Sequence, residues 1–316
     1  MGPVVSVVMP VFNARRHLEG AVRSMLSQTF ELLELIAVDD GSNDGSGAIL
    51  EELAAGDRRM RVIARPREGI TPALNAGIAA ARGAFIARMD SDDIARPDRL
   101  ARQVSFLRAR PQIAAVGSDY DIIDDEGRVL KTIALPTDPD EIARTLKRTN
   151  CVAHPTALIR TAALDGGATY RRAYRLAEDY DLWLRLAEHH GLANLPVVTV
   201  GYRRSFAADR VDDLVQQSLS ALAARAAARL RAGGQTDGTG SWDAATTENV
   251  HALGVGEPQI AREVRRNALA LARQARSQGA DGASTRYIGL ARRFAPHSEG
   301  PAAWVAYRWQ RAKVRV

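Results

Sequence analysis

The chain has 316 residues, a formal net charge of +6, 46% hydrophobic and 25% charged residues. This composition is typical of a globular protein with room for one large domain and an appendage or for two domains, and only the chain ends and residues 233–241 look loose. A single cysteine, Cys151, excludes an internal disulfide and a cysteine-based metal site, which favours a reducing compartment.

No run of residues approaches the roughly 20 apolar positions that a membrane-spanning helix needs. Residues 1–10 are apolar but lack a basic leader, so they predict a first strand rather than a signal peptide, and we expect a cytoplasmic protein or at most one bound to the inner membrane surface. The excess positive charge is mostly scattered arginine without interleaved aromatic residues. We therefore expect no nucleic-acid partner.

The first 93 residues alternate between predicted strands and helices. Apolar or β-branched runs predict strands at 4–9, 34–38, 61–64 and 85–89, and the segments between them predict helices at 13–27, 46–55 and 71–82. This alternation predicts right-handed crossovers and a parallel sheet. Ligands of such sheets bind beyond the carboxyl ends of the strands.

Polar clusters follow three of these strands, at residues 10–13, 39–42 and 90–93. We expect them to meet at one edge of the sheet. The sequence contains neither a Gly-x-Gly-x-x-Gly motif after the first strand nor a P-loop motif, so neither a dinucleotide site nor a P-loop is predicted. Turn and helix-capping roles remain open for Asp39, Asp40 and Asn13.

The third cluster places Asp90, Asp92 and Asp93 directly after an apolar strand. Three carboxylates cannot be buried there unless a positive charge neutralises them. Asp90 and Asp92 lie two residues apart, so they share a face of an extended chain, and their hard oxygen atoms suit Mg²⁺ or Mn²⁺. The alternative is that Asp92 or Asp93 only caps a helix that begins near Pro97.

Beyond residue 97 the strict alternation stops. A helix at 97–108, a strand at 113–117, a hairpin around 125–127, a helix at 138–147 and strands at 156–159 and 192–202 predict a mixed extension of the sheet that receives a second substrate. His154 lies at the mouth of a strand, where it contacts either a bound diphosphate or acceptor or only a local hydrogen-bonding partner. Residues 176–186 predict a helix whose first turn carries Glu178 and Asp179.

The order and spacing of five strings resemble the nucleotide-binding half of a family 2 glycosyltransferase with the GT-A fold. The strings are residues 6–13, 28–30, 38–45, 74–77 and 89–93. The resemblance extends to about residue 203 and implies an α/β fold with a mixed, Rossmann-like central sheet and helices on both faces. It implies that Asp40 accepts a hydrogen bond from the uracil ring. The other donor-binding residues that it implies are Pro10, Phe12, Asn13, Asn75, Asp90, Ser91 and Asp92.

The pair Glu178 and Asp179 resembles the Glu-Asp signature of the same family, in which the aspartate is the catalytic base. By this resemblance Asp179 is the base and Glu178 shapes the acceptor site or positions Asp179. Asp90 and Asp92 would hold Mn²⁺ or Mg²⁺, and either Asp92 or Asp93 is the closer ligand. One base and one metal site fit a single displacement with inversion at the anomeric carbon.

The predicted activity is transfer of a sugar from a nucleotide-sugar donor, a UDP-sugar, to a glycan or lipid-linked acceptor in cell-surface polysaccharide synthesis. Two alternatives stay open. One is a non-catalytic scaffold protein that binds a nucleotide-sugar. The other is a sugar nucleotidyltransferase, which is expected to carry a glycine-rich, basic loop after the first strand, unlike residues 10–13.

We therefore predict a GT-A domain at 1–205, with a nucleotide-binding half at 1–118 and an acceptor half at 119–205, and a helical extension at 206–316. Helices are predicted at 211–231, 257–278 and 283–294, with a flexible linker at 233–241. Residues 304–315 mix aromatic and basic side chains, which fits either peripheral contact with an anionic membrane surface or packing onto neighbouring helices.

Overall fold

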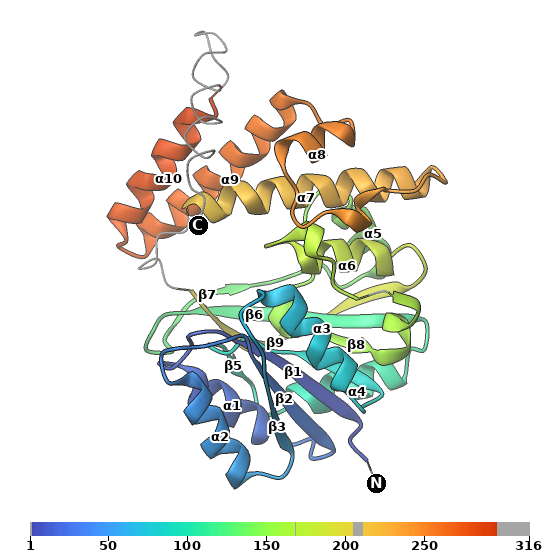
Figure 1. The fold of residues 1–316 in the computed structure, drawn as a ribbon, viewed down its shortest axis with the longest axis vertical. Coiled ribbons are helices and arrows are strands. Elements are labelled where there is room, and N and C mark those ends of the chain that lie inside the picture. Colours follow the sequence, from blue (N-terminus) through green and yellow to red (C-terminus); the bar gives the residue numbers. More distant parts are fainter. Residues whose placement is uncertain (1, 168, 205–210, 296–316) are drawn as a thin grey trace.

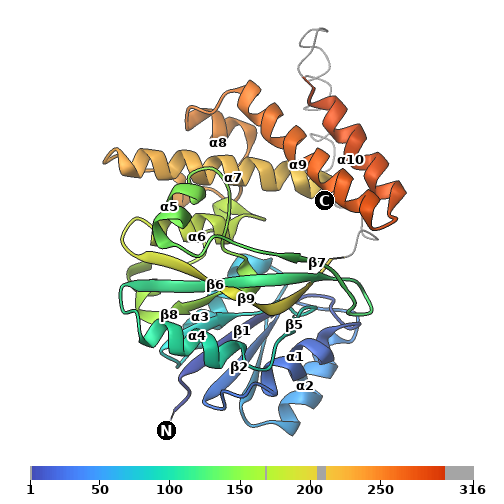
Figure 2. The same ribbon diagram turned by 180° about the vertical axis from the view of Figure 1, so that it is seen from behind.

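The computed structural model describes residues 2–167, 169–204 and 211–295. A sheet flanked by helices forms one end of the molecule, and helices from the C-terminal third of the chain stack on the other end (Figure 1). The view from behind shows the same division (Figure 2). The predicted membrane-contacting tail at 304–315 lies outside the described residues.

The first four strands form the predicted parallel sheet. They are β1 (Val5–Val11), β2 (Leu33–Asp39), β3 (Met60–Ala64) and β4 (Phe85–Arg88), in the order β3-β2-β1-β4. Every residue of β1 and β2 is buried, as expected for strands covered on both faces. Three helices connect them, namely α1 (Leu18–Leu26), α2 (Ser46–Gly56) and α3 (Ile70–Ala80).

Alternate side chains of β1 belong to different cores. Val7 and Met9 pack with residues of α1, α2 and α4 (Arg99–Arg108), whereas Val8 packs with Leu74 of α3. This period of two is the expected consequence of the pleat. The helices therefore cover both faces and leave the carboxyl ends of the strands open for ligands.

The second half of the sheet is mixed, as predicted. It contains β6 (Ile113–Ile123), β7 (Val129–Ile133), β8 (Leu158–Arg160) and β9 (Gly191–Arg203). Strand β8 runs antiparallel to both β4 and β6, and β9 runs parallel to β6. Nine strands of the described chain thus form one sheet.

A two-residue strand, β5 (Ile94–Ala95), pairs with β9 and was not predicted. It separates the acidic residues 90–93 from α4, whose N-cap position is Asp98. The alternative that Asp92 or Asp93 caps this helix is therefore wrong. The physical reason is long-range pairing, because the carboxylate of Asp93 accepts a hydrogen bond from the backbone N–H of Arg203, at 2.7 Å.

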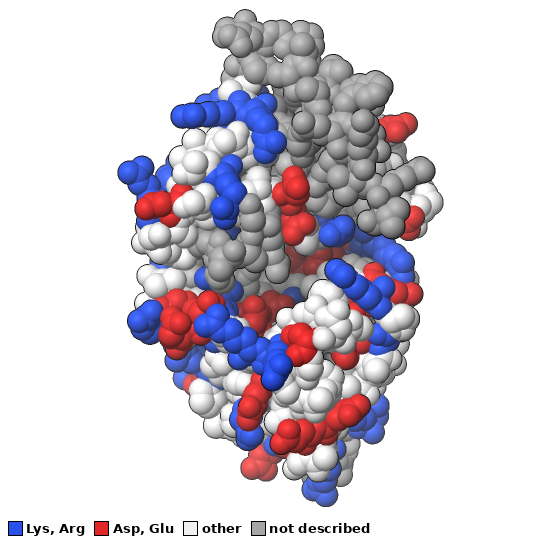
Figure 3. Space-filling view, turned by 60° about the vertical axis from the view of Figure 1, so that its left-hand side comes forward, with Lys and Arg blue, Asp and Glu red and all other residues white. Residues whose placement is uncertain are grey.

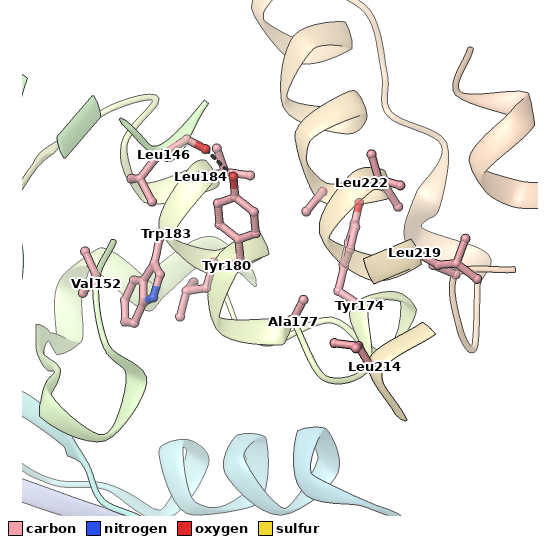
Figure 4. Packing of buried hydrophobic residues seen from close by; sticks show 14 of the residues in the cluster. Leu146, Val152, Tyr174, Ala177, Tyr180, Trp183, Leu184, Leu214, Leu219 and Leu222 are labelled. Carbon is pink, nitrogen blue, oxygen red and sulfur yellow. Dashed lines mark hydrogen bonds between the residues drawn. The ribbon is translucent and has the colours of Figure 1, made fainter. Parts of the chain in front are cut away.

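The remaining helices pack beside the mixed half. They are α5 (Pro139–Leu146), α6 (Glu178–Leu186), α7 (Val211–Ala232), α8 (Thr247–Ala252), α9 (Glu257–Ser277) and α10 (Asp281–Arg293). Tyr174 and Tyr180 lie on the α6 side of a core that Leu219 and Leu222 of α7 complete (Figure 4). The helical extension is therefore built onto the helix that carries the predicted base. None of the described helices combines the length and apolar character that crossing a membrane requires.

The prediction of a flexible linker at 233–241 was wrong. Asp237 forms ion pairs with Arg171 and Arg231, and Thr239 is fully buried and contacts the hydroxyl of Tyr174 at 3.0 Å. Glycine and polar residues make this segment look loose in the sequence, but the ion pairs of Asp237 with Arg171 and Arg231 hold it against the α6 region.

Replacing Asp237 by Asn should lower the free energy of unfolding by about 1–3 kcal/mol, because two largely buried arginines lose a charged acceptor. Urea unfolding at neutral pH measures this change. Asp243→Asn, at an exposed position of the same region, is the matched control and should have little effect. Equal stability of the two variants would contradict the packed structure of this segment.

Candidate active site

A cleft of about 930 Å³ lies at the carboxyl edge of β1, β2 and β4. The three predicted polar clusters meet there, since residues from each line the cleft. Acidic side chains gather, with basic ones beside them, across the middle of the face shown in Figure 3. The predicted donor-binding residues that line the cleft are Pro10, Phe12, Asn13, Asp40, Asp90, Ser91 and Asp92.

Asp40 stands at one end of this cleft and organises the loop before α3. Its side chain is 4% exposed, and its two carboxylate oxygens accept hydrogen bonds from the backbone N–H groups of Glu68 (2.9 Å) and Gly69 (2.8 Å). The carboxylate is therefore fixed in orientation while it remains at the cleft wall. An oxygen with one such bond still has a lone pair for a ligand N–H group.

Phe12 and Asn13 form the neighbouring wall. The ring of Phe12 is exposed, and the guanidinium carbon of Arg67 lies 4.2 Å from its centroid. Asn13 has a φ of +50°, and its side-chain oxygen accepts a hydrogen bond from the N–H of Asn43 at 2.9 Å. Asn13 thus joins the loops that follow β1 and β2. The helix-capping alternative for Asn13 is wrong, because α1 begins at Leu18 and its N-cap position is His17. The predicted ligand contact of Asn13 stays a prediction.

Arg67 lines the cleft but was missed from the sequence. It lies three residues beyond β3, at the same carboxyl edge as the three acidic and polar clusters. Because ligands bind beyond the carboxyl ends of parallel strands, the residues that follow the third predicted strand would have pointed to Arg67. The adjacent Arg65 and Glu68 pair at 2.6 Å, which helps to hold this loop in place.

The acidic tip of β4 is partly neutralised by an arginine of the same strand. Arg88 is 4% exposed and forms an ion pair with Asp90. Asp92 lines the cleft, and burial together with the charge of Asp90 raises its pKa to about 6. Asp93 is fully buried and bonded to Arg203, and burial raises its pKa as well. Of the two candidate ligands, Asp92 is therefore the one that faces the cleft.

Asp90 and Asp92 offer carboxylate oxygens at one wall of the cleft, a donor set that fits Mg²⁺ or Mn²⁺. Among the described residues, no group of three His, Cys, Asp or Glu side chains is arranged to hold a metal ion. An ion at this position would therefore take its remaining ligands from water and from a bound diphosphate, as Mg²⁺ commonly does.

Helix α6 begins with Glu178 and Asp179, where the helix dipole favours negative charge. Asp179 is partly exposed. Its carboxylate accepts hydrogen bonds from the side-chain amide of Asn150 (2.8 Å) and from the N–H of Tyr180 (2.7 Å). Leu176, two residues before the helix, has a φ of +65°, a strained conformation for a branched residue.

Glu178 is 5% exposed, and one of its carboxylate oxygens is buried without a hydrogen-bond partner. Burial and the neighbouring charge of Asp179 raise the pKa of Glu178 to about 7. The charge of Asp90 raises it further, and the charge of Arg88 lowers it. The charges of Arg88 and Asp90 thus act on the first turn of α6, and we call Arg88, Asp90, Glu178 and Asp179 the electrostatic cluster. Glu178 and Asp179 do not line the cleft itself.

His154 and Asn75 are placed beside the cluster rather than in the cleft. His154 is buried and lies 2.7 Å from the hydroxyl of Tyr170, and burial with the charge of Arg88 lowers its pKa, so it is neutral at pH 7. The amide of Asn75 donates to the carbonyl of Tyr170 (2.8 Å) and accepts from its N–H (3.0 Å). Asn75 therefore braces the loop of Tyr170, and its predicted donor contact stays a prediction.

Comparison with known proteins decides the family. Residues 6–167 match the family model described as glycosyl transferase family 2. The chain belongs to this family. The matched region includes the acidic tip of β4 and ends before Asp179. Membership confirms the glycosyltransferase activity class expected from the sequence.

Curated relatives carry related names. The glycosyltransferase is 31% identical over 211 residues to an uncharacterized glycosyltransferase of Haemophilus influenzae, covering 64% of this chain and 65% of that protein. It is 36% identical over 192 residues to the putative glycosyltransferase EpsE of Bacillus subtilis, and the match covers 59% of this chain and 68% of EpsE. It is 29% identical over 184 residues to the O-antigen biosynthesis glycosyltransferase WbnJ of Escherichia coli, covering 58% and 71%. The matches thus span about two thirds of these relatives.

Solved structures confirm the predicted GT-A fold. A mannosyltransferase of Pyrobaculum calidifontis, in complex with GDP-Man and Mn²⁺, superposes with a TM-score of 0.59 at 17% identity, covering 100% of this chain and 89% of that one. S. aureus TarS 1–349, in complex with UDP-GlcNAc, gives a TM-score of 0.55 at 16% identity, covering 98% and 92%. At these identities the likeness concerns the fold alone.

Replacing Glu178 by Gln should raise the free energy of unfolding above neutral pH. Because the folded pKa of about 7 exceeds the ordinary glutamate value of 4.5, ionisation progressively destabilises the folded protein as the pH rises from 4.5 through 7. The variant escapes this cost and should gain about 1–3 kcal/mol near pH 8, with little difference near pH 4.

Urea unfolding of both proteins across this pH range measures the effect. Glu51→Gln, on the exposed surface of α2, is the control and should follow the wild-type pH dependence. An unchanged pH dependence in Glu178→Gln would show that this side chain is not held in a desolvated cluster.

Proposed function

We propose that this glycosyltransferase moves a sugar from a UDP-sugar to a glycan or lipid-linked acceptor with inversion at the anomeric carbon, in the synthesis of cell-surface polysaccharide. The observation that carries the proposal is the cleft at the carboxyl edge of the parallel strands, where Asp40 is fixed by two backbone hydrogen bonds and Asp90 and Asp92 line the wall. A transferase of this kind needs negative charge to hold a cation beside the leaving group and a base for the incoming hydroxyl.

The base-binding end of the cleft supports a nucleotide donor. Asp40 is fixed by two backbone hydrogen bonds, and the exposed ring of Phe12 with Arg67 forms the adjacent wall. A carboxylate held in this way would accept a hydrogen bond from the ring N–H of uracil. Since guanine also has a ring N–H, the GDP-Man complex of the structural neighbour makes GDP-sugars the natural comparison in a donor panel.

Asp90 and Asp92 would hold Mn²⁺ or Mg²⁺. When bound, the ion supplies positive charge that stabilises the departing diphosphate. Two arginines hold these acids in place. Arg88 forms an ion pair with Asp90, and the side chain of Arg203 donates a hydrogen bond to the backbone carbonyl of Asp92 at 2.8 Å. The carboxylates therefore do not need to reorganise when the donor arrives.

Asp179 would accept the proton of the acceptor hydroxyl. Asn150 and the N–H of Tyr180 orient its carboxylate, and its partial exposure leaves it accessible. The base attacks no carbon itself, so the acceptor oxygen displaces the diphosphate in one step and the anomeric configuration inverts. The name of WbnJ, an O-antigen biosynthesis glycosyltransferase, supports a polysaccharide acceptor.

A donor panel tests the proposed reaction. With Mn²⁺ or Mg²⁺ present, UDP release from UDP-sugars should exceed GDP release from GDP-sugars, and excess chelator should abolish turnover. Equal turnover in chelator would contradict the metal role. Binding of UDP without turnover of any donor, with acceptor glycans and lipids supplied, would favour the non-catalytic scaffold.

Replacing Asp179 by Asn should reduce kcat by about 10²–10⁴, the usual contribution of a general base. The change removes the proton acceptor but keeps the size of the side chain and a bond to Asn150, so the affinity for UDP should stay within about threefold. Steady-state kinetics and calorimetric titration with UDP measure the two quantities. Asp140→Asn, at the exposed start of α5, is the control and should keep wild-type kinetics.

A further inference from the structure

Two helices of the C-terminal extension concentrate positive charge. Residues 257–293, which contain α9 and α10, carry eight arginines and three acidic residues and hence a net charge of +5, whereas the whole chain of 316 residues has a net charge of +6. Basic side chains are prominent at the upper end of the face in Figure 3, where the extension lies, above the acidic middle of that face. A local excess of this size attracts an anionic partner.

A groove of about 710 Å³ runs along α9 within this basic region, and we call it the α9 groove. Ala261 and Leu269 of α9 and Phe294 after α10 supply apolar lining. Four arginines of α9 also line it, at intervals of three, four and eleven residues that place them on one side of the helix, namely Arg262, Arg265, Arg266 and Arg273. A different stripe of α9, which includes Ile260 and Val264, packs in the core.

Most of the guanidinium groups in the α9 groove have no acidic partner. Arg266 pairs with Glu263 at 2.7 Å. The one acid that lines the groove, Glu257, lies 3.3 Å from His251. Three of the four arginines form no ion pair with any residue that the structure describes, namely Arg262, Arg265 and Arg273. The α9 groove therefore carries more positive charge than its own acids neutralise.

The combination of charge and apolar lining narrows the chemistry of the partner. A guanidinium binds phosphate oxygens through its planar fork of N–H groups, while the stem of an arginine side chain covers apolar surface. A free anion would match only the charges of the α9 groove, and an apolar peptide would match only its lining. A phospholipid surface offers phosphate groups directly beside carbon chains and therefore matches both.

We propose that the α9 groove docks on the surface of a bilayer that contains anionic phospholipids. The unpaired arginines bind lipid phosphates, and the exposed Pro258 and half-buried Leu269 lie against the carbon chains. The surface is a different segment from residues 304–315, for which the sequence suggested membrane contact. Docking would favour a lipid-linked acceptor over a free glycan, and this last step alone rests on the proposed function.

Co-sedimentation of the full chain with vesicles tests the docking. Equimolar vesicles of phosphatidylcholine and phosphatidylglycerol should bind the protein at least about tenfold more tightly than vesicles of phosphatidylcholine alone, because the lipid phosphates must carry net negative charge to attract the groove. The affinity should fall as the salt concentration rises. Donor and acceptor are left out, so the measurement is valid even if the protein transfers no sugar.

A triple variant locates the contact. Arg262→Gln, Arg265→Gln and Arg273→Gln together should weaken binding to the anionic vesicles by at least about tenfold, since each basic residue near an anionic surface contributes about fivefold. The melting temperature should stay close to that of the wild type, because the three side chains form no ion pair with the described residues. If the triple variant does not fold, Arg273→Gln alone decides, with an expected loss of about fivefold.

The matched control removes the same charge from exposed positions outside the α9 groove, through the substitutions Arg58→Gln, Arg108→Gln and Arg144→Gln. It should weaken binding by less than about threefold, because its arginines lie on other elements. Equal losses in the two triple variants, or no binding of the wild type to anionic vesicles at low salt, would overturn the proposal. Binding to polyglutamate without binding to vesicles would also overturn it, in favour of an acidic protein partner.

Discussion

The ion pair of Arg88 and Asp90 is the constraint on which the site depends. Acids from the tip of β4 and from the start of α6 are gathered in a region with little access to water, where an unpaired charge is strongly unfavourable. A buried guanidinium and the positive end of α6 offset this repulsion, but only in part, since the pKa values of Asp92 and Glu178 remain raised. The molecule thus keeps unfavourable negative charge where a transferase would need to attract a cation and remove a proton.

Main-chain hydrogen bonds hold the loops around this charge. Asp40 fixes the loop before α3, Asn75 fixes the loop of Tyr170, and the acidic tip is bonded to Arg203 at the end of β9. Two loops are also strained, at Asn13 and Leu176, which is affordable only because neighbouring contacts determine their conformation. The result is a site whose polar groups are oriented before any ligand binds, the condition for effective electrostatic stabilisation.

The helical extension contributes to the same arrangement. Helix α7 packs on α6 through a core that includes Tyr180, the residue that follows the proposed base. Asp237 adds ionic contacts to the α6 region from the segment after α7. Changes in the extension can therefore alter the position of Asp179 without touching the cleft. This packing gives the C-terminal third of the chain a structural connection to the catalytic half.

The sequence by itself determined the alternation of strands and helices and the first turn of α6, because these follow from local periodicity. It also determined the polar clusters at the strand ends, because ligands of parallel sheets bind beyond the carboxyl ends of the strands. It also indicated that the acids at 90–93 need a cation. Only the tertiary structure decided that Arg88 pairs with Asp90, that Asp93 turns to Arg203, that Asn75 braces Tyr170 and that β5 and the 233–241 segment are packed. Apart from the Arg88–Asp90 pair, which joins residues two apart at the end of β4, these features depend on contacts between residues far apart in the chain. Local sequence patterns carry no information about which distant partners will meet.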